Sequence, residues 1–462
     1  MIGNTMKEII YAIFLSFFLC GLCGNAEAKK KKEVKKAIKR EVQTPYDKLF
    51  KGKKAFTVNG LMKMHLMAGK VYAEFPIELL NRDLALTSSI EDISDNGEGV
   101  VGQFAGRVNQ FRFTLQDSML QARLVRRYGV KNTGMGKNAD QIIERSNTPG
   151  IFQSYKILAY TPDKKAVVVD MTELFLESSR LTNPFPSYAG NSLYGFVQRI
   201  HKFQSQRSEL LGICGNDNSM SVRCNLGFNV DRLVLGSFMQ AKDVPVSVTV
   251  NKILMLLPED PMRPRLADSR IGVNAIIQTE LPDVCQGIKP YYITKRWRIE
   301  PVDEIRYKQG EMVDVKKPIV FYIDTLMPNS WIKYVKAGAE AWNAAFEKIG
   351  LRNVVRTELF PKDSSFDAGD IHNSVIRYAP SWMYYPQYSM HTDPRTGEIL
   401  NASVYLPANV ASYFYTSRTE ETMAVDPSVR KARLSEEQFG EMFKAKMMQA
   451  IGRCLGLTDN YA

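Results

Sequence analysis

Histidine is scarce in this chain. Four histidines occur among 462 residues, and no two of them are four positions apart. Helical zinc motifs place two histidines at positions i and i+4, so that both side chains lie on one face of the helix. We therefore expect His65, His201, His372 and His391 to be solvated or hydrogen-bonded in ordinary ways. A metal site rebuilt from His372, His391 and Asp459 is the less favoured alternative.

Long apolar runs are also scarce. After the first 28 residues, no stretch reaches the roughly 20 apolar residues that a membrane-spanning helix needs. The shorter run Ile9–Gly24 follows Lys7 and precedes Ala26-Glu27-Ala28, which is the order of charge, apolar core and small residues in a secretory signal peptide. We therefore expect residues 1–28 to be a signal peptide, the mature chain to begin at Lys29, and no transmembrane segment to remain.

Cysteine is sparse, with six residues in the whole chain. Cys20 and Cys23 lie in the expected signal peptide, and each follows a leucine where a lipoprotein signal has a small residue, so simple cleavage is favoured over a lipid anchor. An oxidising compartment would permit a disulfide between Cys214 and Cys224. Two unpaired buried thiols are the alternative that the sequence leaves open.

The formal net charge is +12, but it is unevenly distributed. The segment Lys29–Arg40 alone holds eight lysines and arginines against one glutamate. A nucleic-acid-binding protein would be expected to spread its basic residues over a folded face, with aromatic side chains for stacking. We therefore expect no nucleic-acid partner. The basic segment is interpreted as a flexible tail, and weak contact with an anionic lipid or lipopolysaccharide surface is the alternative.

Composition and patterning predict a folded protein of several domains. Hydrophobic residues make up 45% of the chain and charged residues 24%, which is ordinary globular usage and excludes a collagen, a wholly disordered chain or a heptad rod. No internal repeats are found. After the signal peptide (1–28) and a basic flexible tail (29–45), we expect a small β module at 46–95, a β-rich domain with some helix at 96–290, and a third domain at 291–462.

In the third domain, strand and helix periodicities alternate. The apolar run Pro318–Asp324 predicts a strand, and the stripe of large apolar residues in Ser330–Ile349 predicts an amphipathic helix. Further strands are expected over Asn353–Phe360, Ser374–Tyr378 and Ala402–Leu406. The last helix should begin after Ser435, which forms a capping box with Gln438, and should break at Gly456. The resulting order is β-α-β-β-β-α, and the expected fold class is α+β.

Several segments, each weak alone, are distinctive in combination: Lys51–Pro76, Asp92–Asn96, Pro261–Gly272, Arg296–Glu300, Pro318–Asp324, Ala339–Gly350 and Asp393–Leu400. Through them the chain resembles the exported zinc metalloproteases of Gram-negative bacteria that have a metzincin-like catalytic domain. The resemblance implies β-rich N-terminal modules followed by a partial metzincin-like α/β domain. It also implies a location in the periplasm or at the cell surface.

In that family the last helix carries the motif HExxHxxGxxH, whose three histidines hold zinc and whose glutamate is the general base. In this chain the resemblance places Gln449 at the first ligand position, Ala450 at the base, Arg453 at the second ligand and Asp459 at the third. A catalytic zinc site needs three protein ligands, and a guanidinium is always protonated. We therefore expect no metal ligand, no catalytic residue and no cofactor.

Three interpretations follow from the resemblance. The leading one is a catalytically inactive metalloprotease homologue, either a truncated relict or a module that binds a peptide or protein in the cell envelope. The family continues with a Met-containing turn beyond the third ligand position, whereas this chain ends at Ala462. The second is an active zinc metallopeptidase with non-standard or partner-supplied ligands. The third is a structural or binding envelope protein that acts through its N-terminal β domains.

Overall fold

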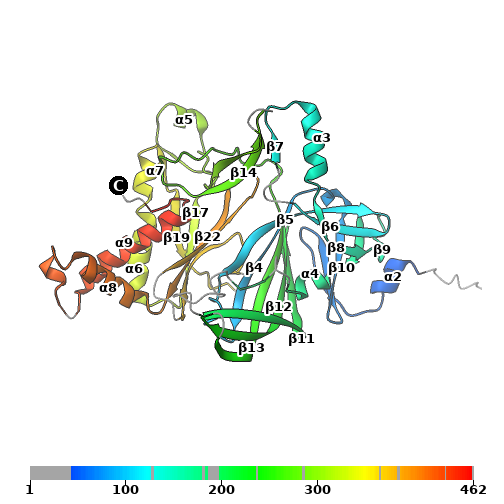
Figure 1. The fold of residues 1–462 in the computed structure, drawn as a ribbon, viewed down its shortest axis with the longest axis horizontal. Coiled ribbons are helices and arrows are strands. Elements are labelled where there is room, and N and C mark those ends of the chain that lie inside the picture. The colour runs from blue at the N-terminus through cyan, green and yellow to red at the C-terminus, as the bar shows by residue number, and fades with distance from the viewer. Residues whose placement is uncertain are drawn as a thin grey trace, which may run out of the picture. The chain divides into compact units, whose positions relative to one another are not determined.

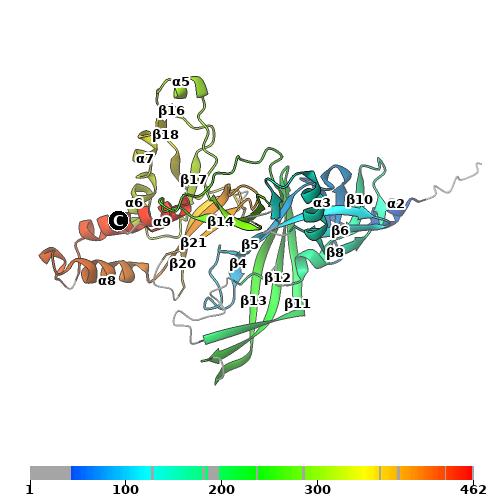
Figure 2. The same ribbon diagram turned by 45° about the horizontal axis from the view of Figure 1, so that its top comes forward.

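The structure is a computed structural model that describes residues 43–125, 130–178, 183–185, 197–235, 238–283, 287–363, 366–381, 386–431 and 433–459 (Figures 1 and 2). The expected signal peptide, with Cys20 and Cys23, and nearly all of the basic tail lie outside the described residues. Residues Thr44–Ala462 cluster as one unit. Among the described helices, none combines the length and the apolar character needed to cross a bilayer.

The first sheet combines strands from two distant parts of the chain. It follows a short helix, α2 (Pro45–Phe50), and its antiparallel strands lie in the order β1-β2-β3-β10-β9. The strands are β1 (Phe56–Val58), β2 (Lys63–Met67), β3 (Lys70–Pro76), β9 (Ala159–Tyr160) and β10 (Ala166–Asp170). Because β10 pairs with β3, the module expected at 46–95 is not a separate sheet.

The second sheet has seven strands in the order β11-β12-β13-β4-β5-β6-β8, and all neighbours are antiparallel. Its members are β4 (Leu84–Ile93), β5 (Phe104–Gln116), β6 (Met119–Leu124), β8 (Gly150–Lys156), β11 (Val197–Asn216), β12 (Ser219–Val234) and β13 (Phe238–Leu256). Side chains of both sheets, among them Phe75, Phe111 and Phe113, share one buried core. Each such side chain contributes about 1.5–3 kcal/mol by leaving water.

The remaining elements outside the C-terminal sheet and its helices are short. They include two small sheets, β15-β14-β7 and β16-β18. Their strands are β7 (Val130–Asn132), β14 (Ala275–Leu281), β15 (Lys289–Thr294), β16 (Val313–Asp314) and β18 (Leu351–Arg352). The short helices are η1 (Ile77–Leu79), α3 (Lys137–Ser146), α4 (Thr172–Leu176) and α5 (Glu304–Lys308).

The C-terminal part of the chain is built on a mixed sheet of five strands. Its strand order is β19-β17-β20-β22-β21, in which four strands are parallel and β21 runs antiparallel to β22. The strands are β17 (Ile319–Ile323), β19 (Val355–Leu359), β20 (Ser374–Ala379), β21 (Gln387–Thr392) and β22 (Ile399–Pro407). The helices of this part are α6 (Asn329–Glu340), α7 (Asn343–Glu347), α8 (Val410–Thr422), η3 (Pro427–Val429) and α9 (Glu436–Cys454). Figure 1 shows α6 and α9 beside this sheet.

Aromatic contacts join the seven-stranded sheet to the C-terminal sheet. The backbone N–H of Phe104 in β5 donates to the Tyr405 hydroxyl at 3.3 Å, and the Phe104 ring lies 4.7 Å from the ring of His391 in β21. Tyr405 and His391 are both buried. Through these side chains β5 packs against both β21 and β22 without adding a strand to their sheet.

The expected α+β class, with a partial metzincin-like domain, is wrong. Among the residues that the structure describes, 44% lie in strands against 21% in helices, and several of the sheets are antiparallel, so this part of the chain is mostly β. The main difference is that the sequence analysis predicts no strand where the structure has β11 and β12, which have 20 and 16 residues. In addition, the helix expected over Ser330–Ile349 is interrupted between α6 and α7.

Some of the predicted helices and strands are present in the structure, and other elements were not predicted. The strand expected over Pro318–Asp324 is present as β17, and the helix expected to open at Ser435 is present as α9. The elements β18, β21 and α8 were not anticipated. Two of the expected domain boundaries can be placed relative to the described strands. The boundary at 95/96 divides β4 from its partner β5, and the boundary at 290/291 falls inside β15.

The disulfide considered between Cys214 and Cys224 is not formed, and both thiols are free. The two residues lie on the adjacent strands β11 and β12, but the register pairs Cys214 with Ser221 and Cys224 with Leu210. This offset along the hairpin keeps the two sulfur atoms apart. Cys224 is buried and its thiol donates to the carbonyl of Phe175, whereas Cys214 is exposed. Cys285 lies outside the described residues.

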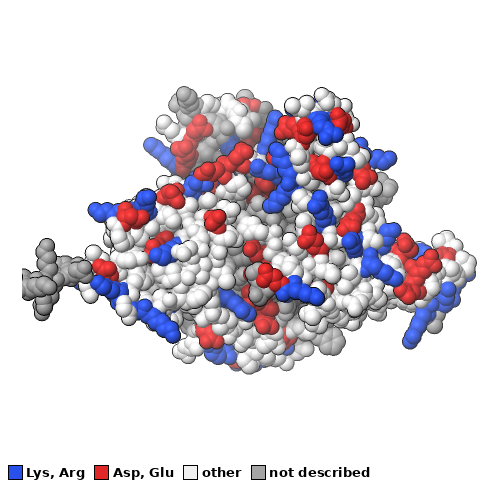
Figure 3. Space-filling view, turned by 180° about the vertical axis from the view of Figure 1, so that it is seen from behind, with Lys and Arg blue, Asp and Glu red and all other residues white. Residues whose placement is uncertain are grey.

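Charged side chains are mixed on the molecular face shown in Figure 3, where basic and acidic groups lie interspersed. Mixing of the two signs avoids a large field of one sign over this face.

Close packing of α6 against α9 depends on glycines. A Cβ atom at Gly338 of α6 would lie 2.7 Å from both the carbonyl oxygen of Lys444 and the Cβ of Met447 in α9. A Cβ atom at Gly440 would overlap the Tyr334 ring, and one at Gly452 would lie 2.6 Å from the Trp342 ring. Glycine at these positions therefore sets how near α9 lies to α6 and to Trp342.

We expect Gly338→Ala to lower the free energy of unfolding by about 1–3 kcal/mol, because the added methyl group meets backbone that has no room to yield. The gain of helix propensity, about 1 kcal/mol, only partly offsets this cost. Lys336→Ala, at an exposed position on the same helix, is the control and should change stability by less than about 0.5 kcal/mol. Equal urea midpoints for the two variants would contradict this account of the packing.

Candidate functional site

Helix α9 carries the residues at the motif positions, and its sequence explains where it begins. The Ser435 hydroxyl accepts from the backbone N–H of Gln438, and the Gln438 side chain accepts from the backbone N–H of Ser435, both at 3.2 Å. Glu436 and Glu437 add negative charge in the first turn, which favours the positive end of the helix dipole. The capping box predicted from the sequence is therefore confirmed.

The chain reverses direction directly after α9. Gly456 has φ +100°, a conformation that favours glycine, and a Cβ there would collide with the carbonyl oxygen of Lys295. The next residues pair with a distant segment, because Leu457 bridges Val273 and the N–H of Thr458 donates to the carbonyl of Gly272 at 2.9 Å. This pairing holds Asp459 beside the last turns of the helix.

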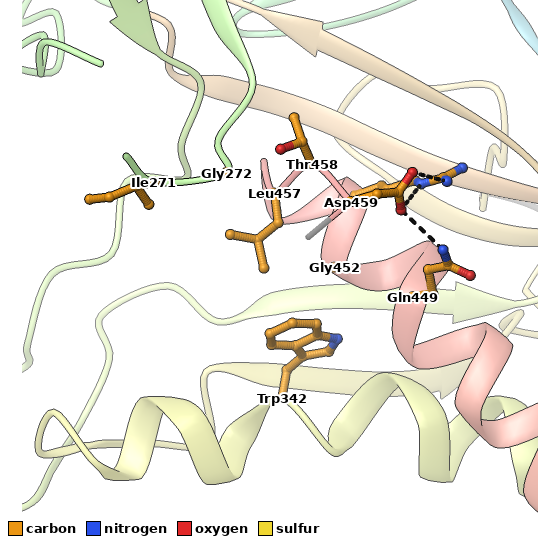
Figure 4. A pocket seen from close by; sticks show the side chains of 9 residues that line it. Ile271, Gly272, Trp342, Gln449, Gly452, Leu457, Thr458 and Asp459 are labelled. Carbon is orange, nitrogen blue, oxygen red and sulfur yellow. Dashed lines mark hydrogen bonds and ion pairs between the residues drawn. The ribbon is translucent and has the colours of Figure 1, made fainter. Parts of the chain in front are cut away.

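The side chains of Gln449 and Arg453 both point to the carboxylate of Asp459 (Figure 4). The Arg453 guanidinium donates from Nη2 to Asp459 Oδ2 at 2.6 Å and from Nε to Oδ1 at 3.3 Å. The Gln449 amide donates from Nε2 to Asp459 Oδ1 at 3.0 Å. We call these three residues the polar cluster. They occupy the three positions at which the resemblance places zinc ligands.

The polar cluster is electrostatically satisfied. Hydrogen bonds from Arg453 and then Gln449 hold the pKa of the Asp459 carboxyl below its ordinary value, so the carboxylate stays charged at neutral pH. The guanidinium carbon of Arg453 also lies 5.6 Å from the centre of the Tyr388 ring in β21, which is within the range of a cation–π contact. Arg453 thus links the helix both to the terminal segment and to the edge of the sheet.

These residues do not fit a zinc ion. Zinc is held by thiolate, imidazole or carboxylate ligands, and of the three side chains only Asp459 offers one. At about 4 Å, two unit charges repel by about 4 kcal/mol at an effective dielectric constant of 20, so a divalent ion beside Arg453 would face roughly twice that cost. Asp459 is moreover engaged by Arg453.

Ala450 stands where the resemblance would place a general base. Ala450 is 7% exposed, and its methyl group has no atom that accepts a proton. A positioned general acid or base commonly contributes about 10² to 10⁴ in rate. The site therefore lacks the proton acceptor that the motif would supply.

Two cavities adjoin the polar cluster. The first, which we call the large cavity, has a volume of about 700 Å³ and lies between the cluster and an apolar wall formed by Ile271, Trp342 and Leu457. In Figure 4, the Trp342 ring faces Leu457 across this space. The indole N–H of Trp342 donates to the carbonyl of Met448 at 2.9 Å, which fixes the ring against α9.

The second cavity, which we call the small cavity, has a volume of about 270 Å³ and lies between α9 and the edge strand β21. Its lining includes Gln449, Ala450 and Arg453, together with Lys446, Tyr388 and Tyr413. The sequence patterns did not identify Lys446, Trp342 or Tyr388 as residues of a site. Helical periodicity could have found Lys446, because it lies seven positions before Arg453 and shares its face of the helix.

The four histidines lie apart from the polar cluster and from one another. His65 contacts Glu74 at 2.9 Å, His201 contacts Glu98 at 2.8 Å, and His372 contacts Asp370 at 2.8 Å. His391 is buried, and burial lowers its pKa to about 4. Within the part of the chain that the structure describes, no group of three or more His, Cys, Asp or Glu side chains is arranged to hold a metal ion.

Comparison with known proteins adds one family. A sequence-family profile described as a domain of unknown function (DUF5117) matches residues 102–302. The matched region runs from just before β5 to beyond β15 and includes the three long strands β11, β12 and β13. The polar cluster lies outside it. No curated protein and no solved structure matches the chain.

We expect Arg453→Met to raise the pKa of Asp459 toward the ordinary aspartate value of about 3.9, because the main donor to the carboxylate is removed. Gln449→Ala should raise it less, since Arg453 has the larger effect. Carboxyl-carbon NMR titration of Asp459 measures both. Lys446→Met is the control, because Lys446 does not contribute to the Asp459 shift. An Asp459 pKa unchanged by Arg453→Met would show that the ion pair is not formed in solution.

Proposed function

We propose that this protein is an exported, catalytically inactive homologue of zinc metalloproteases that binds an extended peptide in the cell envelope. The observation that carries the proposal is the convergence of Gln449, Arg453 and Asp459 on one point. Residues at positions i, i+4 and i+10 rarely meet unless a turn returns the chain over the helix, and the Gly456 turn does so here. The homology and the export are part of the proposal.

The inactivity is argued from two separate features. An arginine–aspartate ion pair occupies the place of the metal, and alanine occupies the place of the general base. Hydrolysis of a peptide needs both an activated water and an acceptor for its proton. Neither feature compensates for the other, so restoring one alone should not restore activity.

The edge of the C-terminal sheet supports peptide binding. Strand β21 is hydrogen-bonded to β22 on one side, and in the part of the chain that the structure describes no strand pairs with its other side. An extended peptide can add to such an edge through main-chain hydrogen bonds, while pockets select its side chains. The small cavity adjoins Gln387 and Tyr388 of this strand. The edge and its neighbouring cavity thus offer both parts of that mode of recognition.

The proposed descent predicts a gain of metal binding. In the triple variant Gln449→His, Arg453→His, Asp459→His, three imidazoles replace the polar cluster at the same backbone positions. We expect this variant to bind one zinc ion per chain with submicromolar affinity, and the unchanged protein not to, as measured by titration calorimetry. Lys444→His with Lys446→His and Gln449→His, which adds three imidazoles along the helix without the returning segment, should bind at least tenfold more weakly.

A triple variant that is folded by circular dichroism but binds zinc no better than this control would contradict the proposed origin of the site. Both variants carry three new histidines, so the comparison tests where the imidazoles stand and not how many there are.

Peptide binding predicts a local change in hydrogen exchange. A pool of random octapeptides without charged residues should slow amide exchange over Gln387–Met390 when added at millimolar concentration. The reason is that carbonyl groups of the bound peptide accept hydrogen bonds from the unpaired N–H groups of β21. The opposite edge strand of the same sheet, β19, serves as the internal control and should be unchanged. Equal protection at both edges, or protection at neither, would count against binding along β21.

A further inference from the structure

We infer that the small cavity binds a carboxylate group carried by the peptide; this inference rests on the proposed peptide-binding function. The relevant observation is the charge of the cavity wall. Lys446 and Arg453 both line the cavity, and none of the described residues that line it is acidic. A site that the resemblance assigns to a cation is thus bordered by two fixed cations.

The ion-pair partners of these two cations lie outside the cavity lining. Arg453 is bound by Asp459, which lines the large cavity instead. Lys446 lies 3.5 Å from Glu421 of α8, and Glu421 does not line the small cavity either. The acidic groups therefore reduce the positive potential of the cavity without occupying it.

The geometry of Arg453 leaves donors for a second anion. Its Nε and Nη2 atoms donate to Asp459, whereas Nη1 has no hydrogen-bond partner among the described residues. A guanidinium presents its donors in a planar fork that matches a carboxylate. The edge formed by Nη1 and the second N–H of Nη2 can therefore bind a carboxylate while the adjacent edge, formed by Nε and Nη2, keeps Asp459.

Partial burial makes these charges effective. The Lys446 side chain is 24% exposed and the Arg453 side chain is 32% exposed. Charges in such positions are screened less by salt than those on an open surface. An acidic group that enters the cavity therefore meets two cations in a partly desolvated setting.

The size and the walls of the cavity point to a single group of a peptide. Its volume of about 270 Å³ falls below the roughly 300–1,000 Å³ of sites that enclose drug-sized ligands. Tyr388, Tyr413 and Phe414 supply aromatic walls, and Gln449 supplies an amide. A glutamate or aspartate side chain, or the terminal carboxylate of a peptide, has the matching chemistry.

Fluorescence anisotropy with three peptide pools tests the inference. All three are fluorescein-labelled octapeptides randomised among uncharged residues. The first has a fixed central glutamate and an amidated end, the second a fixed glutamine and an amidated end, and the third a fixed glutamine and a free carboxyl end. We expect one of the two anionic pools to bind about ten- to hundredfold more tightly than the neutral pool. The pool that is preferred identifies whether a side chain or the chain end supplies the carboxylate.

Variants assign the preference to the cavity. Lys446→Met should reduce it, and Arg453→Met combined with Asp459→Asn, which avoids leaving Asp459 unpaired, should bring it to within about twofold. Lys444→Met removes one charge from the same helix but not from the cavity lining, and it should leave the preference intact.

The outcomes separate the two proposals. Equal binding of all three pools would overturn the carboxylate inference and leave peptide binding standing. An absence of binding by every pool would overturn peptide binding, and the inference with it. A loss of preference in Lys444→Met as large as that in Lys446→Met would also overturn the inference, because it would reflect net charge rather than the cavity.

Discussion

The ion pair between Arg453 and Asp459 determines what this site can be. The two side chains are partly exposed, and they are joined by two hydrogen bonds, from Nε and Nη2 of Arg453 to the Asp459 carboxylate. Their pairing connects the last turns of α9 with the segment that follows the Gly456 turn. Gln449 adds a third contact to the same carboxylate. As a result, the point at which three side chains converge is already filled by complementary charges.

The cavities on either side of the polar cluster depend on this arrangement. Asp459 lies toward the large cavity, so its negative charge and the Trp342 wall belong to the same space. Arg453 and Lys446 line the small cavity beside the edge strand. One ion pair thus divides the region into a mixed apolar side and a cationic side. The glycine-dependent contact of α9 with α6 and Trp342 fixes the position of α9, the helix that carries Arg453 and Lys446.

Local sequence signals were reliable where short-range physics decides. The strand β17 and the helix α9, with its capping box and its end near Gly456, lie where the residues predicted them. The fold class was wrong because two long antiparallel strands, β11 and β12, were not predicted. In β12 the signal was present, since apolar residues alternate with polar ones or glycine from Met220 to Val230. In β11 it was absent, because the apolar residues of this strand do not alternate with polar ones. Strand pairing over such distances is decided by partners that the local pattern does not contain.

The sequence by itself determined the chemistry of the site residues: an amide, a methyl group, a guanidinium and a carboxylate at fixed spacings. It also placed Gln449 and Arg453 on one helix face, because four residues make about one turn. Only the tertiary structure decided that Asp459 meets them, because residues 457–459 are held by Gly272 and Val273, far away in the chain. Likewise, only the packing of β21 against α9 brought Tyr388 beside Arg453. Contacts between distant segments depend on sheet register and on the space that glycines leave between helices, and neither is encoded in any single stretch of residues.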